Sequence, residues 1–370
     1  MKTKIYFAPL EGMTTYIYRS AHSAVFPGSI DKYFAPFFMP HTKCDFNFKE
    51  EKDLAPENNR GFVLIPQILT DSAEEVLRYE KILNSMGYDE ININLGCPSP
   101  TVTSKGRGSA FLGRREELDR FLDEIYAHAA GRISIKTRIG HLDPDEFPEI
   151  LEIYNRYPVS ELIIHPRTCK EFYGGIPHHE LFRYALEHSR NPLIYNGDIW
   201  TVDGWKNLCG EMTGSENAGG SSPNGTVRGT GEAQFGVMLG RSAIANPALP
   251  REIRYSAGNS PALPREIRYS AENSPALPRE SEEPPDRSGR VPQDGKITAD
   301  ELTRLLDMVE ASYEEILSGN TPVLYRMKEM WTWMIRMFPG EEKRLKRIKK
   351  AKNMEEYRAA RTDLVRLLRN

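Results

Sequence analysis

Short runs rich in β-branched and aromatic residues recur through the first 247 residues, each followed by a polar loop and a longer amphipathic stretch. The eight runs are Ile5–Ala8, Lys32–Phe37, Phe62–Ile68, Glu90–Leu95, Ile133–Thr137, Glu161–His165, Pro192–Tyr195 and Phe235–Leu239. Their spacing of roughly thirty residues is that of the strand–helix units in an eight-stranded parallel barrel. A doubly wound open sheet has the same alternation, so the runs alone leave both folds open.

The residues that follow these runs favour the barrel. In a parallel barrel the carboxyl ends of all strands meet at one face, and that face carries the active site. Seven of the eight runs end in polar, charged or glycine residues. These residues are Glu11, Gly12, Gln67, Asn94, Lys136, Arg138, His165, Arg167, Asn196, Gly197, Asp198, Gly240 and Arg241. We therefore predict an α/β protein whose main part is a (β/α)8 TIM barrel with a ligand site at one rim.

The segment 88–108 carries the most unusual of these strand ends. Apolar and polar residues alternate up to Leu95 and the pattern then breaks at Gly96-Cys97-Pro98, which places a thiol at a fixed point on a loop. The loop beyond it is polar and basic and includes Lys105 and Arg107. We expect a negatively charged or hydrogen-bonding ligand to lie against this loop.

Two insertions interrupt the repeating pattern. Residues 213–234 are rich in Gly, Ser and Asn, which predicts a flexible loop before the eighth strand. Ala248–Pro261 (ALPREIRYSAGNSP) is repeated almost unchanged as Ala262–Pro275, and a third copy begins at Ala276. Because each copy carries two prolines and the period matches no solenoid unit, we interpret residues 248–297 as a disordered, repeat-containing linker. The barrel domain then covers residues 1–247.

Residues 298–370 have helical periodicity and predict a small all-α domain. Asn353 followed by Glu356 is a capping pattern for the last helix. Residues 324–370 hold 14 Lys and Arg against 6 Asp and Glu, whereas the formal net charge of the whole chain is −3. A basic helical surface on an acidic protein indicates contact with a polyanion.

The remaining composition is that of a soluble protein. No run of about 18 apolar residues is present, so we expect no membrane contact, and the amino terminus lacks the apolar core of a signal peptide. The four cysteines are far apart and form no CxxC pair, which argues against a zinc site and predicts a reduced, cytoplasmic protein without a bound metal. We expect a monomer without a stable protein partner.

The motifs at the strand ends, taken in their order along the chain, resemble those of the bacterial tRNA-dihydrouridine synthases. The motifs are NLGCP at 94–98, KTRIG at 136–140, HPRT at 165–168, YNGDI at 195–199 and GRSAIANP at 240–247. The resemblance implies an FMN-binding TIM barrel followed by a helical tRNA-binding domain. It also implies NADPH-driven reduction of specific tRNA uridines to 5,6-dihydrouridine, with hydride passing from the reduced flavin to C6 and a proton passing from Cys97 to C5.

The resemblance further implies the roles of individual residues. The residues that match flavin contacts are Pro9, Leu10, Glu11, Gln67, Lys136, His165, Asn196, Gly197, Asp198, Gly240 and Arg241. Those expected to contact the flipped uracil or the tRNA backbone are Asn94, Lys105, Arg107, Arg138 and Arg167 in the barrel and Arg344, Lys346, Arg347 and Lys350 in the tail. Tyr173 either flanks the pocket or packs as an ordinary core aromatic.

Two other classes of enzyme fit the same barrel. One is another FMN-dependent reductase acting on a small pyrimidine or enone, and the other is a lyase that uses Lys136 as a Schiff-base amine. The basic tail and the cysteine loop favour the tRNA enzyme. A lyase would be colourless, whereas either flavoenzyme would purify yellow.

Overall fold

The structure is a computed structural model that describes residues 3–214, 235–258 and 294–369. Its strands form one parallel sheet in the order β3-β2-β1-β9-β8-β7-β6-β5-β4. The strands are β1 (Ile5–Phe7), β2 (Lys32–Phe34), β3 (Leu64–Ile65), β4 (Gln67–Ile68), β5 (Glu90–Leu95), β6 (Arg132–Gly140), β7 (Leu162–Thr168), β8 (Leu193–Tyr195) and β9 (Gly236–Leu239). β3 and β4 are two halves of one predicted strand, interrupted at Pro66, and they bring the two edges of the sheet together. The predicted barrel is confirmed.

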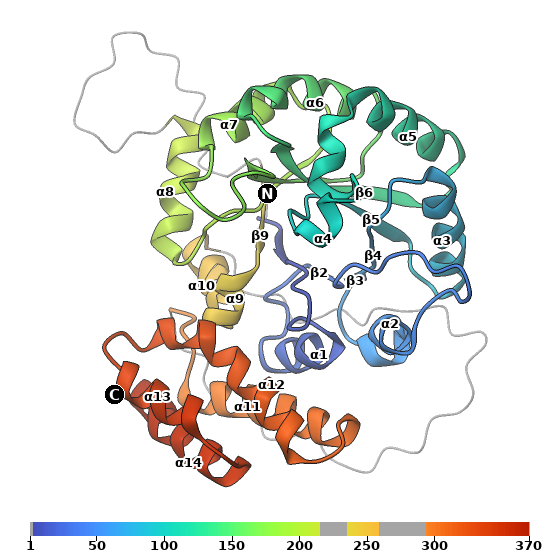
Figure 1. Cartoon of the computed structure of the whole chain (residues 1–370). Helices are drawn as coiled ribbons and strands as arrows, with labels where there is room; N and C mark the ends of the chain where they lie inside the picture. Colours follow the sequence, from blue (N-terminus) through green and yellow to red (C-terminus); the bar gives the residue numbers. More distant parts are fainter. Residues whose placement is uncertain (1–2, 215–234, 259–293, 370) are drawn as a thin grey trace, which may run out of the picture.

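Helices surround this barrel, and several of them alternate with its strands (Figure 1). They are α1 (Tyr16–Val25), α2 (Phe48–Leu54), α3 (Ala73–Ser85), α4 (Pro100–Thr103), α5 (Arg115–His128), α6 (Phe147–Tyr154), α7 (His179–His188), α8 (Val202–Thr213), α9 (Arg241–Ala245) and α10 (Leu249–Ser256). No helix of the described residues is long and apolar enough to cross a lipid bilayer.

Alternation along the strands produces two apolar layers. In β1, Ile5 and Phe7 belong to the large core between strands and helices, whereas Tyr6 belongs to a small separate cluster with Phe34 and Met238. Because successive side chains of a strand point to opposite faces, this second cluster fills the barrel interior.

Charged residues close the amino-terminal end of the barrel. Lys32 lies 2.8 Å from Glu90 and 2.7 Å from Glu161, and both carboxylates are almost completely buried. The Tyr6 hydroxyl donates a hydrogen bond to Glu161. Since these residues lie at or next to the starts of their strands, they seal the end opposite the strand carboxyl ends, and any ligand must enter from the other rim.

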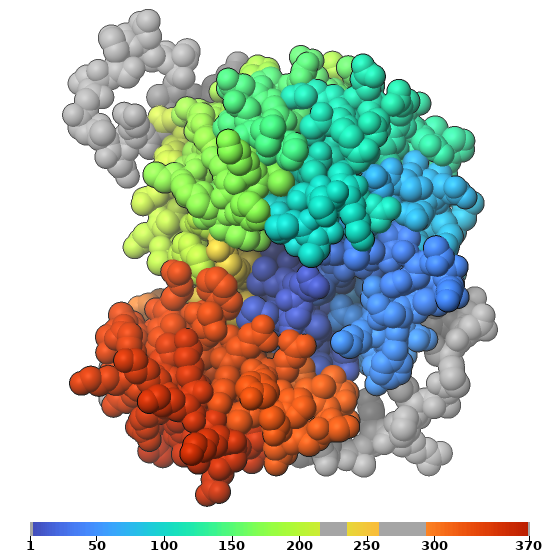
Figure 2. All heavy atoms as spheres, viewed as in Figure 1, coloured from blue at the N-terminus to red at the C-terminus, as the bar shows by residue number. Residues whose placement is uncertain are grey.

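The chain ends in the predicted helical domain, which comprises α11 (Ala299–Ile316), α12 (Asn320–Met334), a 3-10 turn (Ile335–Met337), α13 (Glu342–Lys350) and α14 (Met354–Val365). Thr298 and Glu301 form a capping box on α11, and the Asn353 side chain accepts a hydrogen bond from the Glu356 backbone at the start of α14, as predicted. The helical domain lies directly against the barrel (Figures 1 and 2).

The first repeat copy differs from the expectation. We interpreted residues 248–297 as a disordered linker, and this is wrong for Leu249–Ser256, which form α10. Leu249 and Ile253 are fully buried, and Arg254 pairs with Asp31 at 2.5 Å. The proline of this copy lies in the first helical turn, where it is tolerated. The predictions for residues 215–234 and 259–293 lie outside the described residues.

Candidate active site

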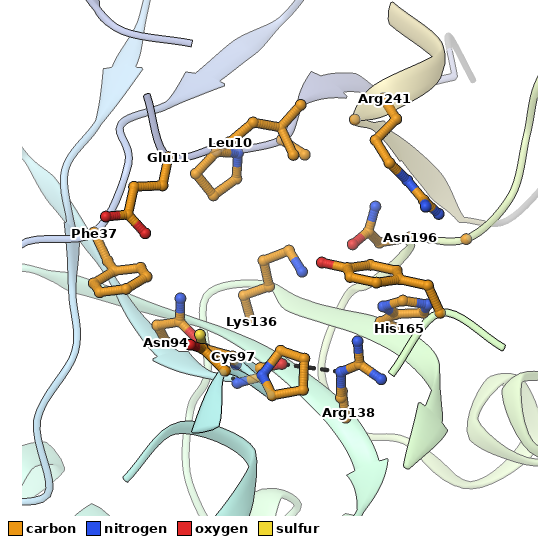
Figure 3. A pocket seen from close by; sticks show the side chains of 18 of the residues that line it. Leu10, Glu11, Phe37, Asn94, Cys97, Lys136, Arg138, His165, Asn196 and Arg241 are labelled. Carbon is orange, nitrogen blue, oxygen red and sulfur yellow. Dashed lines mark hydrogen bonds between the residues drawn. The ribbon is translucent and has the colours of Figure 1, made fainter. Parts of the chain in front are cut away.

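A cavity of about 340 Å³ opens where the strands end, a volume typical of sites for small molecules and cofactors. All eleven residues predicted to contact a flavin line it, together with Cys97, Asn94 and Arg138. In the view of Figure 3, Lys136 lies between Cys97 and Arg241. The space-filling view shows a depression at this rim, bordered by barrel residues and by the helical domain (Figure 2).

Cys97 is held by the end of β5. The Asn94 side-chain oxygen accepts hydrogen bonds from the backbone N–H groups of Gly96 at 3.0 Å and Cys97 at 2.9 Å. The Asn94 amide nitrogen donates to Gln67 at 2.8 Å, and Gln67 in turn donates to Asn92 at 2.7 Å. This row of amides fixes both the turn that carries the thiol and the orientation of Gln67.

The loop beyond Cys97 returns to close behind it. The Ser109 backbone and side chain both donate to the Cys97 carbonyl, at 3.0 and 2.9 Å. Gly108 has a φ of +59°, and a Cβ atom there would lie 2.6 Å from the same carbonyl oxygen. Glycine is therefore required at this position both by the left-handed backbone and by the close approach of the chain.

The Cys97 thiol remains protonated at neutral pH. Burial raises its pKa above the ordinary value of 9.0, and this effect outweighs the opposing influence of the Ser99 backbone N–H and of Lys136. A thiol of this kind can donate a proton but is a poor nucleophile. The raised pKa supports the prediction that Cys97 is not an activated thiolate.

Lys136 is a buried amine of the site that lacks a partner among the described residues. Burial, and secondarily the neighbouring Arg138, lowers its pKa from 10.5 to about 7. No hydrogen bond or ion pair of its ammonium group is found within residues 3–214, 235–258 and 294–369. A partly buried amine without a partner is costly unless a ligand supplies an acceptor or a negative charge.

A second positive group lies at the side of the cavity formed after β7, β8 and β9. Asp198 pairs with Arg167 at 2.6 Å and with Arg241 at 2.9 Å, so two arginines share one carboxylate. Arg167 also donates to His165 Nε2 at 3.1 Å. Burial and the surrounding cations lower the pKa of His165 well below its ordinary value, so the ring is neutral and accepts this hydrogen bond. The surplus positive charge suits an anionic group.

The two arginines predicted to contact the uracil are placed differently. Arg138 lines the cavity and donates to the backbone carbonyls of Gly96 at 3.0 Å and Thr168 at 2.7 Å. Arg167 is buried behind His165, outside the cavity lining, and donates to the carbonyls of Gly174 and Gly175. Both side chains thus hold the loops that form the rim.

The other predicted RNA contacts lie away from the cavity. Lys105 is exposed, and Arg107 pairs with Asp71 at 2.8 Å. Lys346 and Lys350 are exposed on α13. Arg344 and Arg347, on the same helix, both pair with Asp363 of α14, at 3.4 and 2.7 Å. These positions can meet a large ligand but not a small molecule in the cavity.

Several aromatic residues of the site were not predicted. Phe37, Phe172 and Trp200 line the cavity. Tyr173 does so as well, which settles its two interpretations in favour of the pocket. Trp200 follows the YNGDI motif directly, and this position was the one signal in the sequence that could have identified it.

The donor set fits a flavin mononucleotide. The unpaired Lys136 ammonium and the Gln67 amide suit the polar edge of an isoalloxazine ring, where negative charge accumulates on reduction. The surplus charge at Arg241 suits a phosphate. Among the described residues, no cluster of His, Cys, Asp and Glu has the arrangement of a metal site.

Comparisons with known proteins agree with this chemistry. The family model described as "Dihydrouridine synthase (Dus)" matches residues 8–218. The chain is 26% identical to the tRNA-dihydrouridine(16) synthase of Pseudomonas putida and 24% identical to that of Ralstonia nicotianae, in each case over 68% of this chain and 73% of the relative. It is 27% identical to a probable tRNA-dihydrouridine synthase of Staphylococcus epidermidis, over 65% of this chain and 68% of the relative.

Proposed function

The chain belongs to the dihydrouridine synthase family, and from this premise we propose that it reduces specific uridines of tRNA to 5,6-dihydrouridine, with FMN as its flavin and NADPH as the reductant. The observation that carries the proposal is a protonated thiol, Cys97, in the same cavity as the unpaired cation Lys136. Reduction of a uracil C5–C6 bond requires one hydride and one proton. When bound, FMN would supply the hydride to C6.

The residues of the chain supply the proton and the binding energy. Cys97 delivers its proton to C5, and the raised pKa of the thiol keeps that proton available at neutral pH. Asn94 and Arg138, which line the cavity beside Cys97, orient the base. Lys136 and Gln67 bind the ring edge of the flavin, and Arg241 with the loop 196–198 binds its phosphate.

The tail supplies the contact with tRNA. A uridine inside folded tRNA must leave its stack to enter a cavity at the end of the barrel, which requires the RNA to be held outside the barrel. α13, a helix of the domain that packs against the barrel, offers exposed Lys346 and Lys350. Basic side chains on such a surface bind the phosphate backbone with little dependence on sequence.

Replacing Cys97 tests the proposal. We expect Cys97→Ala to retain bound FMN and to lower the rate of dihydrouridine formation in tRNA by about 100-fold or more, the usual contribution of a general acid. Cys209→Ala, at a half-buried cysteine of α8 outside the cavity lining, is the matched control and should keep the full rate. Parental rates in the Cys97 variant would show that the thiol is not the proton donor, and reduction of free uridine as fast as tRNA would show that the substrate is a small molecule.

A further inference from the structure

Side chains of the helical domain contact residues that line the cavity. α12 and the 3-10 turn after it lie against α9, the short helix that begins with Arg241 (Figure 1). The ring of Trp333, near the end of α12, stacks on Trp200 with 6.3 Å between the ring centres and 26° between the planes. Since Trp200 lines the cavity, Trp333 contacts a residue of the cavity wall from outside the barrel.

Three aromatic rings surround the Arg241 guanidinium. Its central carbon lies 4.4 Å from the centre of the Tyr173 ring and 5.6 Å from the centres of both the Trp200 and the Trp333 rings. Asp198 pairs with the same group at 2.9 Å. Of these four neighbours, Trp333 alone belongs to the helical domain.

A second arginine of the helical domain supports this arrangement. The guanidinium of Arg336, an exposed residue in the turn after α12, lies 4.1 Å from the centre of the Trp200 ring. Contacts between arginine and tryptophan are attractive because the cation faces the negative π-surface of the ring. Arg336 and Trp333 therefore hold Trp200 from the helical domain, and Trp200 contacts Arg241.

An arginine held in place binds an anion better than a mobile one. A free arginine side chain loses rotamer entropy when it binds a phosphate, and a side chain already ordered by its surroundings loses less. Asp198 is shared with Arg167, so the positive charge at Arg241 is only partly neutralised. The aromatic contacts thus fix an available cation at the anionic end of the cavity.

We propose that the helical domain completes the phosphate end of the cofactor pocket, with Trp333 as a positioning residue for Arg241 and Arg336 as its support through Trp200. This inference rests on the proposed function, because the anionic ligand is taken to be the phosphate of FMN. It gives the helical domain a role in cofactor affinity in addition to its role in RNA binding.

Comparing FMN with riboflavin, which lacks the phosphate, tests the inference. Dissociation constants are measured by flavin fluorescence with flavin-free full-length protein. For Trp333→Ala we expect the dissociation constant of FMN to rise about tenfold, the size of a buried cation–π contact, and that of riboflavin to change less than twofold. Trp333→Phe should retain most of the affinity for FMN. The matched control is Tyr325→Ala, which removes an exposed aromatic side chain from the same helix and should change neither constant.

Arg336→Ala is the second variant, and its exposed side chain makes misfolding a poor explanation for any effect. We expect it to weaken FMN binding about threefold and to leave riboflavin unaffected. Equal losses for FMN and riboflavin, or unchanged FMN binding in both variants, would overturn the inference. A loss of tRNA binding without a loss of FMN binding would also overturn it, because it would show that Trp200 and Trp333 contact the RNA and do not position the phosphate site. Wild-type protein that binds no flavin would overturn the proposed function as well.

Discussion

Replacing Lys136 by methionine should stabilise the flavin-free protein and weaken its affinity for FMN. The ammonium group has no partner among the described residues, and burial lowers its pKa to about 7. The folded protein therefore bears the cost of a charge that only a ligand would compensate. Methionine has a similar length and no charge, so it removes this cost and also the contact with the ligand.

The pH dependence follows from the two pKa values. The difference between 10.5 in the unfolded chain and about 7 in the folded protein corresponds to about 5 kcal/mol of preference for the neutral amine. Because the unfolded chain binds more protons between these values, the stability of the unsubstituted protein rises with pH across this range. The loss of folding free energy caused by Lys136 is close to the full 5 kcal/mol at pH 6 and falls to about 2 kcal/mol at pH 9. Water in the open cavity reduces both figures, so we expect Lys136→Met to gain about 2 kcal/mol at pH 6 and about 1 kcal/mol at pH 9.

Urea unfolding of the flavin-free protein, followed by circular dichroism at the two pH values, measures this gain. Lys32→Met is the matched control, because Lys32 is a barrel lysine that pairs with two buried carboxylates. Its replacement removes the cation that Glu90 and Glu161 share and leaves Glu161 with Lys4 and Glu90 with Arg132, so it should destabilise the protein at both pH values. A gain for Lys136→Met that does not change with pH, or a loss of stability at pH 6, would refute the reasoning. Unchanged FMN affinity in the Lys136→Met variant would show that Lys136 does not bind the cofactor.

Two further predictions concern the tail and the cysteine loop. The double variant Lys346→Glu, Lys350→Glu should bind tRNA more weakly, and the slope of its binding constant against salt concentration should fall by the contribution of about two phosphate contacts, measured by filter binding at several salt concentrations. The control Lys81→Glu, on the outer helix α3, should change neither the affinity nor the slope. An unchanged slope in the double variant would contradict a contact with the RNA backbone. Gly108→Ala should cost at least about 2 kcal/mol in thermal unfolding, because strain and a steric clash combine. Gly87 has a positive φ of +94° but no atom within 4 Å of the added Cβ, so Gly87→Ala should cost about 1 kcal/mol from the backbone conformation alone. Equal losses at the two glycines would show that the structure absorbs the clash at Gly108.

The sequence predicted most of the site because the site depends on strand ends. Each residue that ends a barrel strand reaches the same rim whatever the length of the loops, so Gln67, Lys136 and Arg241 could be grouped without coordinates. Their chemical roles are a different matter. Arg138 and Arg167 both lie near the carboxyl ends of their strands and both donate to backbone carbonyls, and the sequence pattern is the same for both. Of the two, Arg138 lines the cavity and Arg167 does not.

The repeat copies show that local sequence is equally limited as a guide to secondary structure. Residues 248–261 and 262–275 are almost identical, and their composition predicted one linker for both. The first copy follows Pro247 directly, where Arg254 can reach Asp31 and Arg251 can reach Glu301 of the α11 capping box. The first copy forms α10 because it lies close to β9 along the chain, and local composition does not indicate this proximity.

By itself the sequence determined the approximate positions of the barrel strands, the cap of the last helix and the cysteine on its loop, since propensity, periodicity and capping act over a few residues. Tertiary structure alone decided which arginines face the cavity, which repeat copy forms α10, and that Trp333 reaches Arg241 from another domain. These features depend on contacts between residues far apart in the chain, and such contacts are selected by the packing of the whole molecule.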